Sequence, residues 1–172
     1  SMRTLLSRLP ALLMSTRAAK LSSMTAESTF KLNDGTEHPV IGYGTYKVGV
    51  IPASASSATS NADMATDVVN PADCVKQAIE CGYRFLDCAE FYANEAAVGE
   101  GIAASGVPRE QLYLASKVWT TTIYNGPEAV QAQLEKTLKD LRTDYIDLYC
   151  IHWPVPGQHV EAYLQLEKGK AA

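Results

Sequence analysis

The chain has 172 residues, 47% of them hydrophobic and 20% charged, which is ordinary for one soluble globular domain. Its first 26 residues hold four of the 15 basic residues and no acidic one. The rest therefore has a net charge of −8, from 11 basic and 19 acidic residues. Such an acidic body lacks a basic stripe for phosphates, which argues against nucleic acid binding. No apolar run is as long as a transmembrane helix, so we expect no membrane partner.

Residues 1–28 form a predicted N-terminal extension. Its first 26 residues contain arginine and serine but no acidic residue, which fits a mitochondrial transit peptide and a disordered extension equally well. Met24 is a candidate alternative start that would yield a cytoplasmic form. We therefore expect a cytoplasmic protein, with mitochondrial import as the alternative.

The cysteines show no metal or disulfide pattern. They stand at positions 74, 81, 88 and 150, and their spacings match neither a zinc site nor a CxxC motif. The three histidines add no ligand pair. We predict reduced thiols, no disulfide and no metal.

The predicted elements begin with a hairpin. Residues 30–32 alternate between apolar and polar, Asp34-Gly35 suits a turn, and residues 39–41 would form the return strand. Residues 42–46 are predicted as another strand, whose glycines suggest that something packs closely against the backbone. Residues 48–70 are rich in Ala, Ser and Thr, which predicts a flexible insertion, either a lid over the active face or a segment without function.

Helices and strands then alternate. The predicted helices are Asn70–Gly82 with Asn70 as cap, 94–105, a helix from Pro127 with an apolar stripe, and 161–168; the stripe is Val130, Leu134, Leu138 and Leu141. The predicted strands are 83–87, 112–117 and 145–151, the last nearly all apolar except Asp147, as in a parallel strand covered on both faces. This order predicts an α/β fold with a parallel sheet. A barrel and an open sheet both fit, and the lack of a GxGxxG turn favours the barrel.

Four polar residues stand at or just beyond the ends of predicted strands, where such folds gather their active sites. Asp87, Lys117 and His152 end strands, and Tyr92 follows Asp87 by five residues. Carbonyl reduction needs a proton donor, and a tyrosine hydroxyl serves when an ammonium group stabilises its phenolate. A carboxylate would hold the ammonium, and an imidazole would orient the carbonyl. Taken singly, each residue also has a structural explanation, as a packed aromatic, a cap or salt-bridge partner, a solvated strand end or a core histidine.

Ordered motifs around these residues resemble those of the aldo-keto reductases. Gly82–Glu95 resembles the first signature of that family, Ser116–Trp119 and Asp144–Pro154 the next two blocks, and Gly42–Tyr46 the segment on its first barrel strand. The resemblance spans roughly residues 29 to 168. The segment 154–163 is most similar to the diketogulonate-reductase and prostaglandin-F-synthase-like branch.

The resemblance implies a (β/α)8 TIM barrel that reduces aldehydes or ketones to alcohols with NADPH, without metal or flavin. It implies Tyr92 as the proton donor, Lys117 as the group that makes the phenol a stronger acid, Asp87 as the support of Lys117, and His152 as the group that orients the substrate.

The resemblance also implies binding residues for two small molecules. Gly44, Thr45, Tyr46 and Asp87 would lie beside the nicotinamide end of the cofactor. The pocket for a small carbonyl substrate would be lined by Tyr46, Trp119, His152 and Trp153.

The length departs from that of the family, because a (β/α)8 barrel typically has about 250 residues. The resemblance therefore implies that residues 29–172 are the N-terminal half, with a leading β-hairpin and about four βα units. Such a half would expose two sheet edges, so it would either be unstable alone or self-associate through them, whereas a full-length protein would be a monomer. The alternative to an enzyme is a non-catalytic reductase-like fragment that acts as a binding or regulatory subunit.

Overall fold

The computed structural model describes residues 25, 27–48 and 70–170, and the chain divides into two units, Ser1–Val40 and Ile41–Ala172. The first unit contains the predicted hairpin, with strand β1 at Thr29–Lys31 and strand β2 at Glu37–Pro39 in antiparallel pairing. The predicted return strand, 39–41, was placed too late. Leu32 N donates to Thr36 O at 2.8 Å, and the Asp34 carboxylate accepts from Thr36 N at 3.0 Å, so pairing resumes directly after Thr36.

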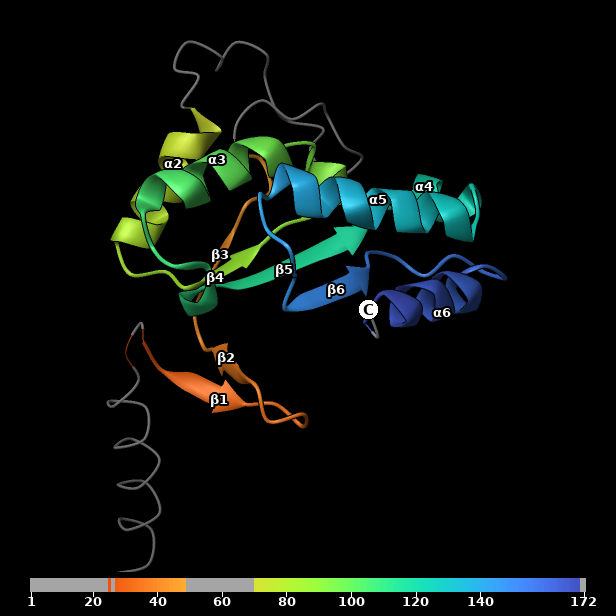
Figure 1. Ribbon diagram of the computed structural model, residues 1–172, viewed down its shortest axis with the longest axis horizontal. Helices are drawn as coiled ribbons and strands as arrows, with labels where there is room; N and C mark the ends of the chain where they lie inside the picture. The colour runs from red at the N-terminus through yellow and green to blue at the C-terminus, as the bar shows by residue number, and fades with distance from the viewer. Residues whose placement is uncertain (1–24, 26, 49–69, 171–172) are drawn as a thin grey trace, which may run out of the picture. The chain divides into compact units, whose positions relative to one another are not determined.

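The second unit is built on the predicted parallel sheet. Its strands run side by side in the order β3, β4, β5 and β6, with bounds Gly42–Gly44, Phe85–Asp87, Tyr113–Val118 and Leu148–Ile151. Each neighbouring pair is parallel, so the carboxyl ends of the strands meet at one edge of the sheet (Figure 1). Of the predicted insertion 48–70, residues 49–69 lie outside the described residues.

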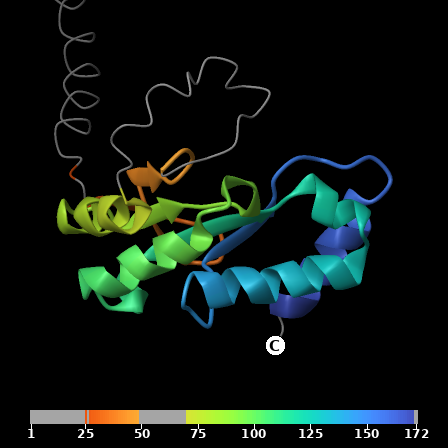
Figure 2. The same cartoon turned by 90° about the horizontal axis from the view of Figure 1, so that it is seen from above.

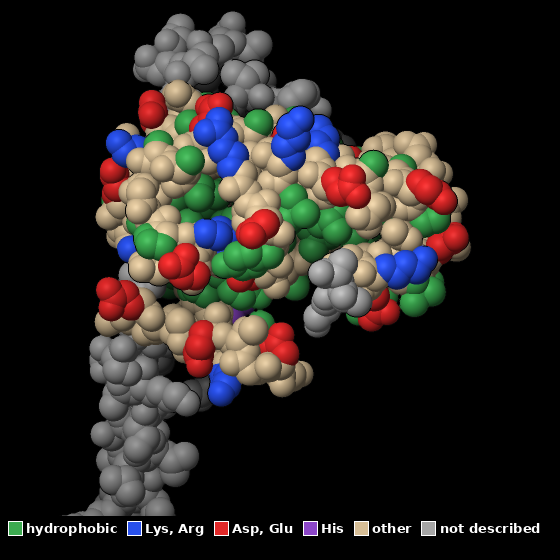
Figure 3. Space-filling view, viewed as in Figure 1, with side chains coloured by type: hydrophobic (Ala, Val, Ile, Leu, Met, Phe, Trp, Pro, Cys, Tyr) green, Lys and Arg blue, Asp and Glu red, His purple; other side chains and the backbone are tan. Residues whose placement is uncertain are grey.

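The described part of this unit also contains five α-helices, three of which cover one face of the sheet (Figure 1). They are α2 at Pro71–Glu80, α3 at Glu95–Ser105, α4 at Thr120–Tyr124, α5 at Pro127–Asp140 and α6 at His159–Lys170. Helices α2, α3 and α5 form the covering layer, and α6 packs against α5 and β6 (Figures 1 and 2). On the side shown in Figure 3, charges of both signs are interspersed over this layer. None of the helices in the described segments is both long and apolar enough to cross a membrane.

Helix α2 begins and ends as its sequence predicts. The Asn70 side chain accepts a hydrogen bond from Ala72 N at 3.0 Å, and Pro71 occupies the first helical position. Gly82 follows the helix with a φ of 104°, a left-handed conformation that glycine adopts without strain.

The core lies between α2, α3 and the middle strands. Its buried members include Val75, Ile79, Leu86, Val98 and Leu114. Helix α3 approaches both neighbouring helices closely because two of its residues are glycines. A Cβ on Gly99 would lie 2.1 Å from Asp140 O, and one on Gly101 would lie 2.5 Å from Ala72 O.

The glycines of β3 divide into one that is packed and one that is not. A Cβ on Gly42 would lie 2.3 Å from the ring of Phe85 on β4, which confirms the predicted close packing at this position. A Cβ on Gly44 would meet no atom within 4 Å. The prediction of close packing is therefore wrong for Gly44, which is exposed at the carboxyl end of its strand.

A buried carboxylate joins α3 to the sheet and to α5. Glu95 is 4% exposed and accepts hydrogen bonds from Ser116 Oγ at 2.6 Å and Thr137 Oγ1 at 3.0 Å. Burial raises the pKa of this carboxyl group, because its two hydroxyl partners compensate only in part. On α5, Val130 is buried as the apolar stripe predicts, Leu134 and Leu138 are half-buried, and Thr137 is fully buried because it bonds to Glu95.

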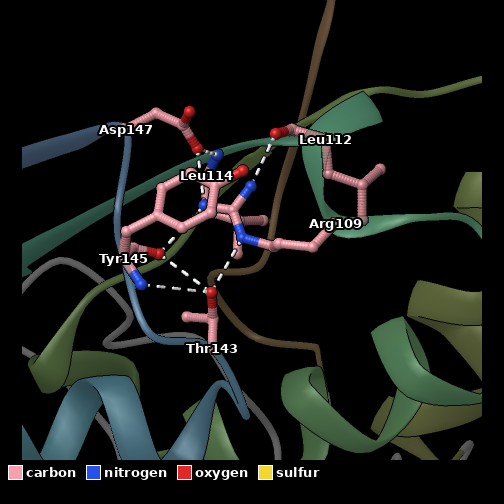
Figure 4. Close-up of polar contacts among 6 residues, drawn as sticks. All are labelled: Arg109, Leu112, Leu114, Thr143, Tyr145 and Asp147. Carbon is pink, nitrogen blue, oxygen red and sulfur yellow. Dashed lines mark hydrogen bonds and ion pairs between the residues drawn. The ribbon is translucent and has the colours of Figure 1, made fainter.

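Strand β6 is shorter and more exposed than the predicted strand 145–151. It begins at Leu148, and Tyr145 and Leu148 are 41% exposed, so the prediction of cover on both faces is wrong in the described structure. The preceding residues are held by Arg109 together with one backbone bond to β5, from Asp147 N to Leu114 O at 3.0 Å (Figure 4). Asp147, the polar exception in the predicted strand, is the carboxylate partner of Arg109.

Arg109 uses its whole guanidinium group. It donates to Thr143 Oγ1 at 2.9 Å, to Leu112 O at 2.7 Å, to Tyr145 O at 3.0 Å and to Asp147 Oδ2 at 2.7 Å (Figure 4). Asp147 Oδ2 also accepts from Leu114 N at 2.8 Å. The Arg109 side chain therefore reinforces the backbone bond that places the start of β6 beside β5.

We predict that Arg109→Met lowers the free energy of unfolding by roughly 2–4 kcal/mol, because three acceptors and a carboxylate lose their donor. The ion pair is mostly shielded, with side chains 18% and 22% exposed. Arg142→Met, which removes an exposed pair with Glu100, is the control and should cost about 1 kcal/mol or less. Urea unfolding of both variants measures the difference, and equal losses would contradict the prediction.

We predict that Glu95→Gln removes a pH dependence of stability. A raised folded pKa means that the folded state holds the proton more tightly, so the wild type loses stability as pH rises from the ordinary value of 4.5 through the folded pKa. The Gln variant lacks this loss, so its stability relative to the wild type should improve across that window. Urea unfolding at stepped pH values measures the free energy of unfolding of both proteins, with Glu100→Gln as the exposed control. A difference between Glu95→Gln and the wild type that stays constant with pH would refute the prediction.

Candidate active site

The centre of the site is the ammonium group of Lys117, on the second-last residue of β5. Lys117 Nζ lies 2.6 Å from Asp87 Oδ1, 2.8 Å from Cys88 O and 3.4 Å from Tyr92 Oη. All three partners come from the end of β4 and the segment that follows it. The structure therefore brings together three groups that the sequence analysis singled out. The carboxylate and the phenol come from the end of β4 and the segment after it, and the ammonium group comes from β5.

Strand alternation explains why Asp87 and Lys117 share a face. Leu86 and Ser116 are fully buried toward the helices, so their neighbours along each strand point to the opposite face. The pairing of Asp87 with Ala115 then places Lys117 one strand away and two residues further along. A long side chain can reach back from there to Asp87.

Tyr92 is positioned by a short 3-10 helix, η2, at Glu90–Tyr92. Tyr92 N donates to Ala89 O at 3.0 Å, and Ala93 ends the turn with a φ of 53°. The Lys117 ammonium lies 5.1 Å from the centre of the Tyr92 ring. The segment therefore turns back toward the sheet and presents the hydroxyl to Lys117.

His152 directly follows β6, and its backbone N donates to Val118 O at 3.1 Å. Its ring lies 5.7 Å from that of Tyr92, at an angle of 86°. Burial lowers the pKa of His152, and the positive charge of Lys117 lowers it further. The imidazole is therefore neutral at pH 7, with one N–H to donate. Its Nδ1 is buried without a hydrogen-bond partner among the described residues.

Aromatic rings surround His152 and Tyr92. The Trp119 ring lies 5.0 Å from the His152 ring and 5.0 Å from the Trp153 ring. The Tyr46 ring lies 5.1 Å from the Tyr92 ring. Trp153 is 59% exposed, so these rings form an open wall beside the phenol rather than a closed core. Of the predicted substrate residues, Tyr46 and His152 thus contact the predicted proton donor, and Trp119 and Trp153 pack on His152.

The predicted cofactor residues divide into two groups. Gly44 is open to solvent and Tyr46 is half-buried, so both offer surface at the carboxyl end of β3, and Asp87 is half-buried beside them. Thr45 is fully buried, and both its backbone N and its Oγ1 donate to Asp87 O at 3.0 Å. Thr45 therefore supports the backbone of Asp87 and has no surface to offer a cofactor.

Two contributors to the site were not predicted from the sequence. The Glu90 carboxylate accepts from Trp119 N at 2.6 Å, and the Phe91 ring lies 4.1 Å from the Trp119 ring. Both residues fall inside the Gly82–Glu95 motif, but their partner lies on a different element. No local spacing in the sequence signals that contact.

The described segments, 27–48 and 70–170, hold no group of three or more His, Cys, Asp or Glu side chains able to bind a metal ion. All four cysteines are free thiols. Cys88 is fully buried beneath the site, and burial raises its pKa to about 12. It is therefore protonated and poorly suited to act as a nucleophile.

We predict that His152 titrates below the ordinary histidine pKa of 6.5, because burial and the Lys117 charge both disfavour its protonation. In Lys117→Met the midpoint should rise, since the variant removes one of the two causes that lower the pKa and leaves Asp87 and Glu90, which raise it. NMR titration of the imidazole protons measures both, with His152→Gln to assign the signal among the three histidines. A midpoint of 6.5 or above in the wild type would contradict the prediction.

Comparisons with known proteins identify the family of the chain. The family model for "Aldo/keto reductase family" matches residues 40–172. A glyoxal reductase of Bacillus subtilis is 41% identical over 142 residues, which are 83% of this chain and 45% of the relative. A methylglyoxal reductase of Salmonella typhi is 50% identical over 93 residues, which are 53% of this chain and 34% of the relative.

Solved structures show the same fold. The aldo-keto reductase of Bombyx mori in complex with NADP is 30% identical with a TM-score of 0.69, covering 86% of this chain and 48% of that one. An aldo-keto reductase from a deep-sea metagenome library is 32% identical with a TM-score of 0.67, covering 84% of this chain and 45% of that one. The chain thus spans half or less of the length of these relatives. The matched family model, the parallel sheet and the relatives together show that the chain belongs to the aldo/keto reductase family.

Proposed function

We propose that this chain carries the proton-delivery site of an NADPH-dependent reductase that converts small aldehydes or ketones to alcohols. The observation that carries the proposal is the contact of one ammonium group, Lys117 Nζ, with both the Asp87 carboxylate and the Tyr92 hydroxyl. A phenol is a weak acid, and a neighbouring positive charge favours its ionised form. That arrangement suits a proton donor for a carbonyl oxygen.

Each residue has a distinct task in the proposed reaction. When bound, NADPH supplies the hydride for the carbonyl carbon. Tyr92 Oη donates a proton to the carbonyl oxygen, and the resulting phenolate is stabilised by Lys117. Asp87 Oδ1 and Cys88 O hold the ammonium group in place at 2.6 Å and 2.8 Å. The N–H of the neutral His152 ring donates a hydrogen bond to the carbonyl oxygen and orients it.

The residues present fit the nicotinamide end of such a cofactor. Gly44 leaves the end of β3 open, so that a flat ring can approach the backbone there. Asp87 lies at the adjacent strand end, in register with Gly44. The backbone of Gly44 and the side chains of Tyr46 and Asp87 would hold this end of the cofactor.

Small dicarbonyl compounds are the proposed substrates. Two of the relatives are named as glyoxal and methylglyoxal reductases. The wall formed by Trp119 and Trp153 gives the site two apolar ring faces, tilted by 53° to each other, and Trp153 is largely exposed. A small planar dicarbonyl can stack there while its oxygen faces Tyr92.

We predict that Tyr92→Phe lowers the rate of methylglyoxal-dependent NADPH oxidation by about 10²- to 10⁴-fold, because it removes the proton donor and keeps the ring. Tyr124→Phe is the matched control, since Tyr124 is exposed on α4 and should keep the wild-type rate. The assay follows the loss of NADPH absorbance. An unchanged rate in Tyr92→Phe would refute the proposed mechanism.

Cofactor binding is measured separately, by quenching of tryptophan fluorescence with NADPH. Both tryptophans of the chain lie in the aromatic wall, so a bound nicotinamide ring should reduce their emission in the wild type and in Tyr92→Phe alike. Absence of quenching in the wild type would instead favour the alternative function, a non-catalytic binding or regulatory subunit.

A further inference from the structure

Glu90, the first residue of η2, links the segment that carries Tyr92 to the start of α4. Its Oε2 accepts a hydrogen bond from Trp119 N at 2.6 Å, and its Oε1 accepts from Thr122 Oγ1 at 2.5 Å. Both carboxylate oxygens are thus used, and both donors are uncharged. Within the described residues, Glu90 forms no ion pair with a lysine, arginine or histidine. Its carboxylate therefore acts through these two hydrogen bonds.

The same carboxylate caps α4 from outside that helix. Trp119 is the N-cap residue of α4 and provides no side-chain cap of its own. The first N–H groups of a helix lack partners within it and carry partial positive charge, so a carboxylate there is favourable. Glu90 takes this place although it lies 29 residues away in the sequence. Its bonds therefore fix the position of η2 against that of Trp119.

The next residue reinforces the link. The Phe91 ring packs on the Trp119 indole at 4.1 Å with an angle of 30°, and it meets the His152 ring edge-on at 6.3 Å. Consecutive residues of η2 thus bind Trp119 in two ways, by a charged hydrogen bond to its backbone and by ring contact with its side chain. Tyr92 is the residue that follows.

We propose that Glu90 is a positioning residue that sets the separation between the Tyr92 hydroxyl and the Trp119 ring of the aromatic wall. The proposal rests on the proposed function, because it concerns where a carbonyl substrate stacks relative to its proton donor. Without the Glu90 carboxylate, α4 loses its cap. The hydrogen bond that holds Trp119 against the segment carrying Tyr92 is then lost, and the Trp119 ring can move away from Tyr92. Substrate would then bind more weakly and with its oxygen misplaced.

The two tryptophans of the chain allow a test that needs no activity. In a Trp153→Phe background, Trp119 is the only source of tryptophan emission. Glu90→Ala should shift that emission to longer wavelength and increase its quenching by acrylamide. Glu90→Gln should restore both signals, because its amide oxygen accepts from Trp119 N and its NH2 donates to the Thr122 hydroxyl. Glu100→Ala, which changes an exposed carboxylate of α3, is the control and should leave them unchanged.

Kinetics of the chain with Trp153 intact separate positioning from simple loss of folded protein. We expect Glu90→Ala to lower kcat/KM for methylglyoxal by about 10- to 100-fold, mainly through a higher KM, since small misplacements have effects of this size. Partial unfolding would instead lower kcat at constant KM. Thr122→Val, which removes one of the two bonds, should give a smaller change in the same direction.

The outcomes separate the two proposals. Wild-type Trp119 signals and KM in Glu90→Ala would overturn the positioning role and leave the proposed function intact. Glu90→Gln and Glu90→Ala showing the same loss of signal would also overturn it. If the parent chain oxidises no NADPH with any carbonyl, the proposed function fails. The acrylamide quenching of Trp119 emission still decides whether Glu90 positions Trp119.

Discussion

The ion pair between Lys117 and Asp87, at 2.6 Å, is the contact on which the geometry of the site depends. It exists because β4 and β5 pair in parallel with Asp87 opposite Ala115. A slip of one residue would turn Lys117 toward the helices and Ser116 toward the site. The ammonium group would then lose Asp87, Cys88 O and the Tyr92 hydroxyl together. Strand register, which hydrophobic burial sets, therefore determines the electrostatics around the phenol.

Polar residues on the helix side of the sheet reinforce this register. Ser116 precedes Lys117 and donates to Glu95, whose other oxygen accepts from Thr137 on α5. A buried carboxylate between two hydroxyls is costly compared with an apolar contact. It nevertheless links α3, β5 and α5 through hydrogen bonds, on the face of the sheet opposite to the Lys117 side chain. Adjacent residues of one strand thus separate the structural task from the chemical one.

Features that depend on short stretches of chain could be predicted from the sequence. The Asn70 cap, the parallel strands and the placement of Asp87, Lys117 and His152 at strand ends all follow from local patterns and the strand–helix repeat. The predicted starts of β2 and β6 were wrong because side chains outside these two strands determine where strand pairing begins. In the hairpin, the Asp34 side chain sets the turn, and at β6 Arg109 holds the chain through Asp147. Glu90 was missed for the same reason, since its partner Trp119 is distant in sequence.

The site separates into a part that is closely bonded and a part that is open. Lys117, Asp87 and Tyr92 are held by hydrogen bonds between β4, η2 and β5, whereas the outer ring of the wall, Trp153, is 59% exposed. Changes among the bonded residues should therefore act on the chemical step, and changes in the wall on substrate binding. Glu90 bonds to Trp119 N from two residues before Tyr92, so it joins the two parts. In the proposed reaction, the fit between proton donor and substrate would depend on that link as much as on either part alone.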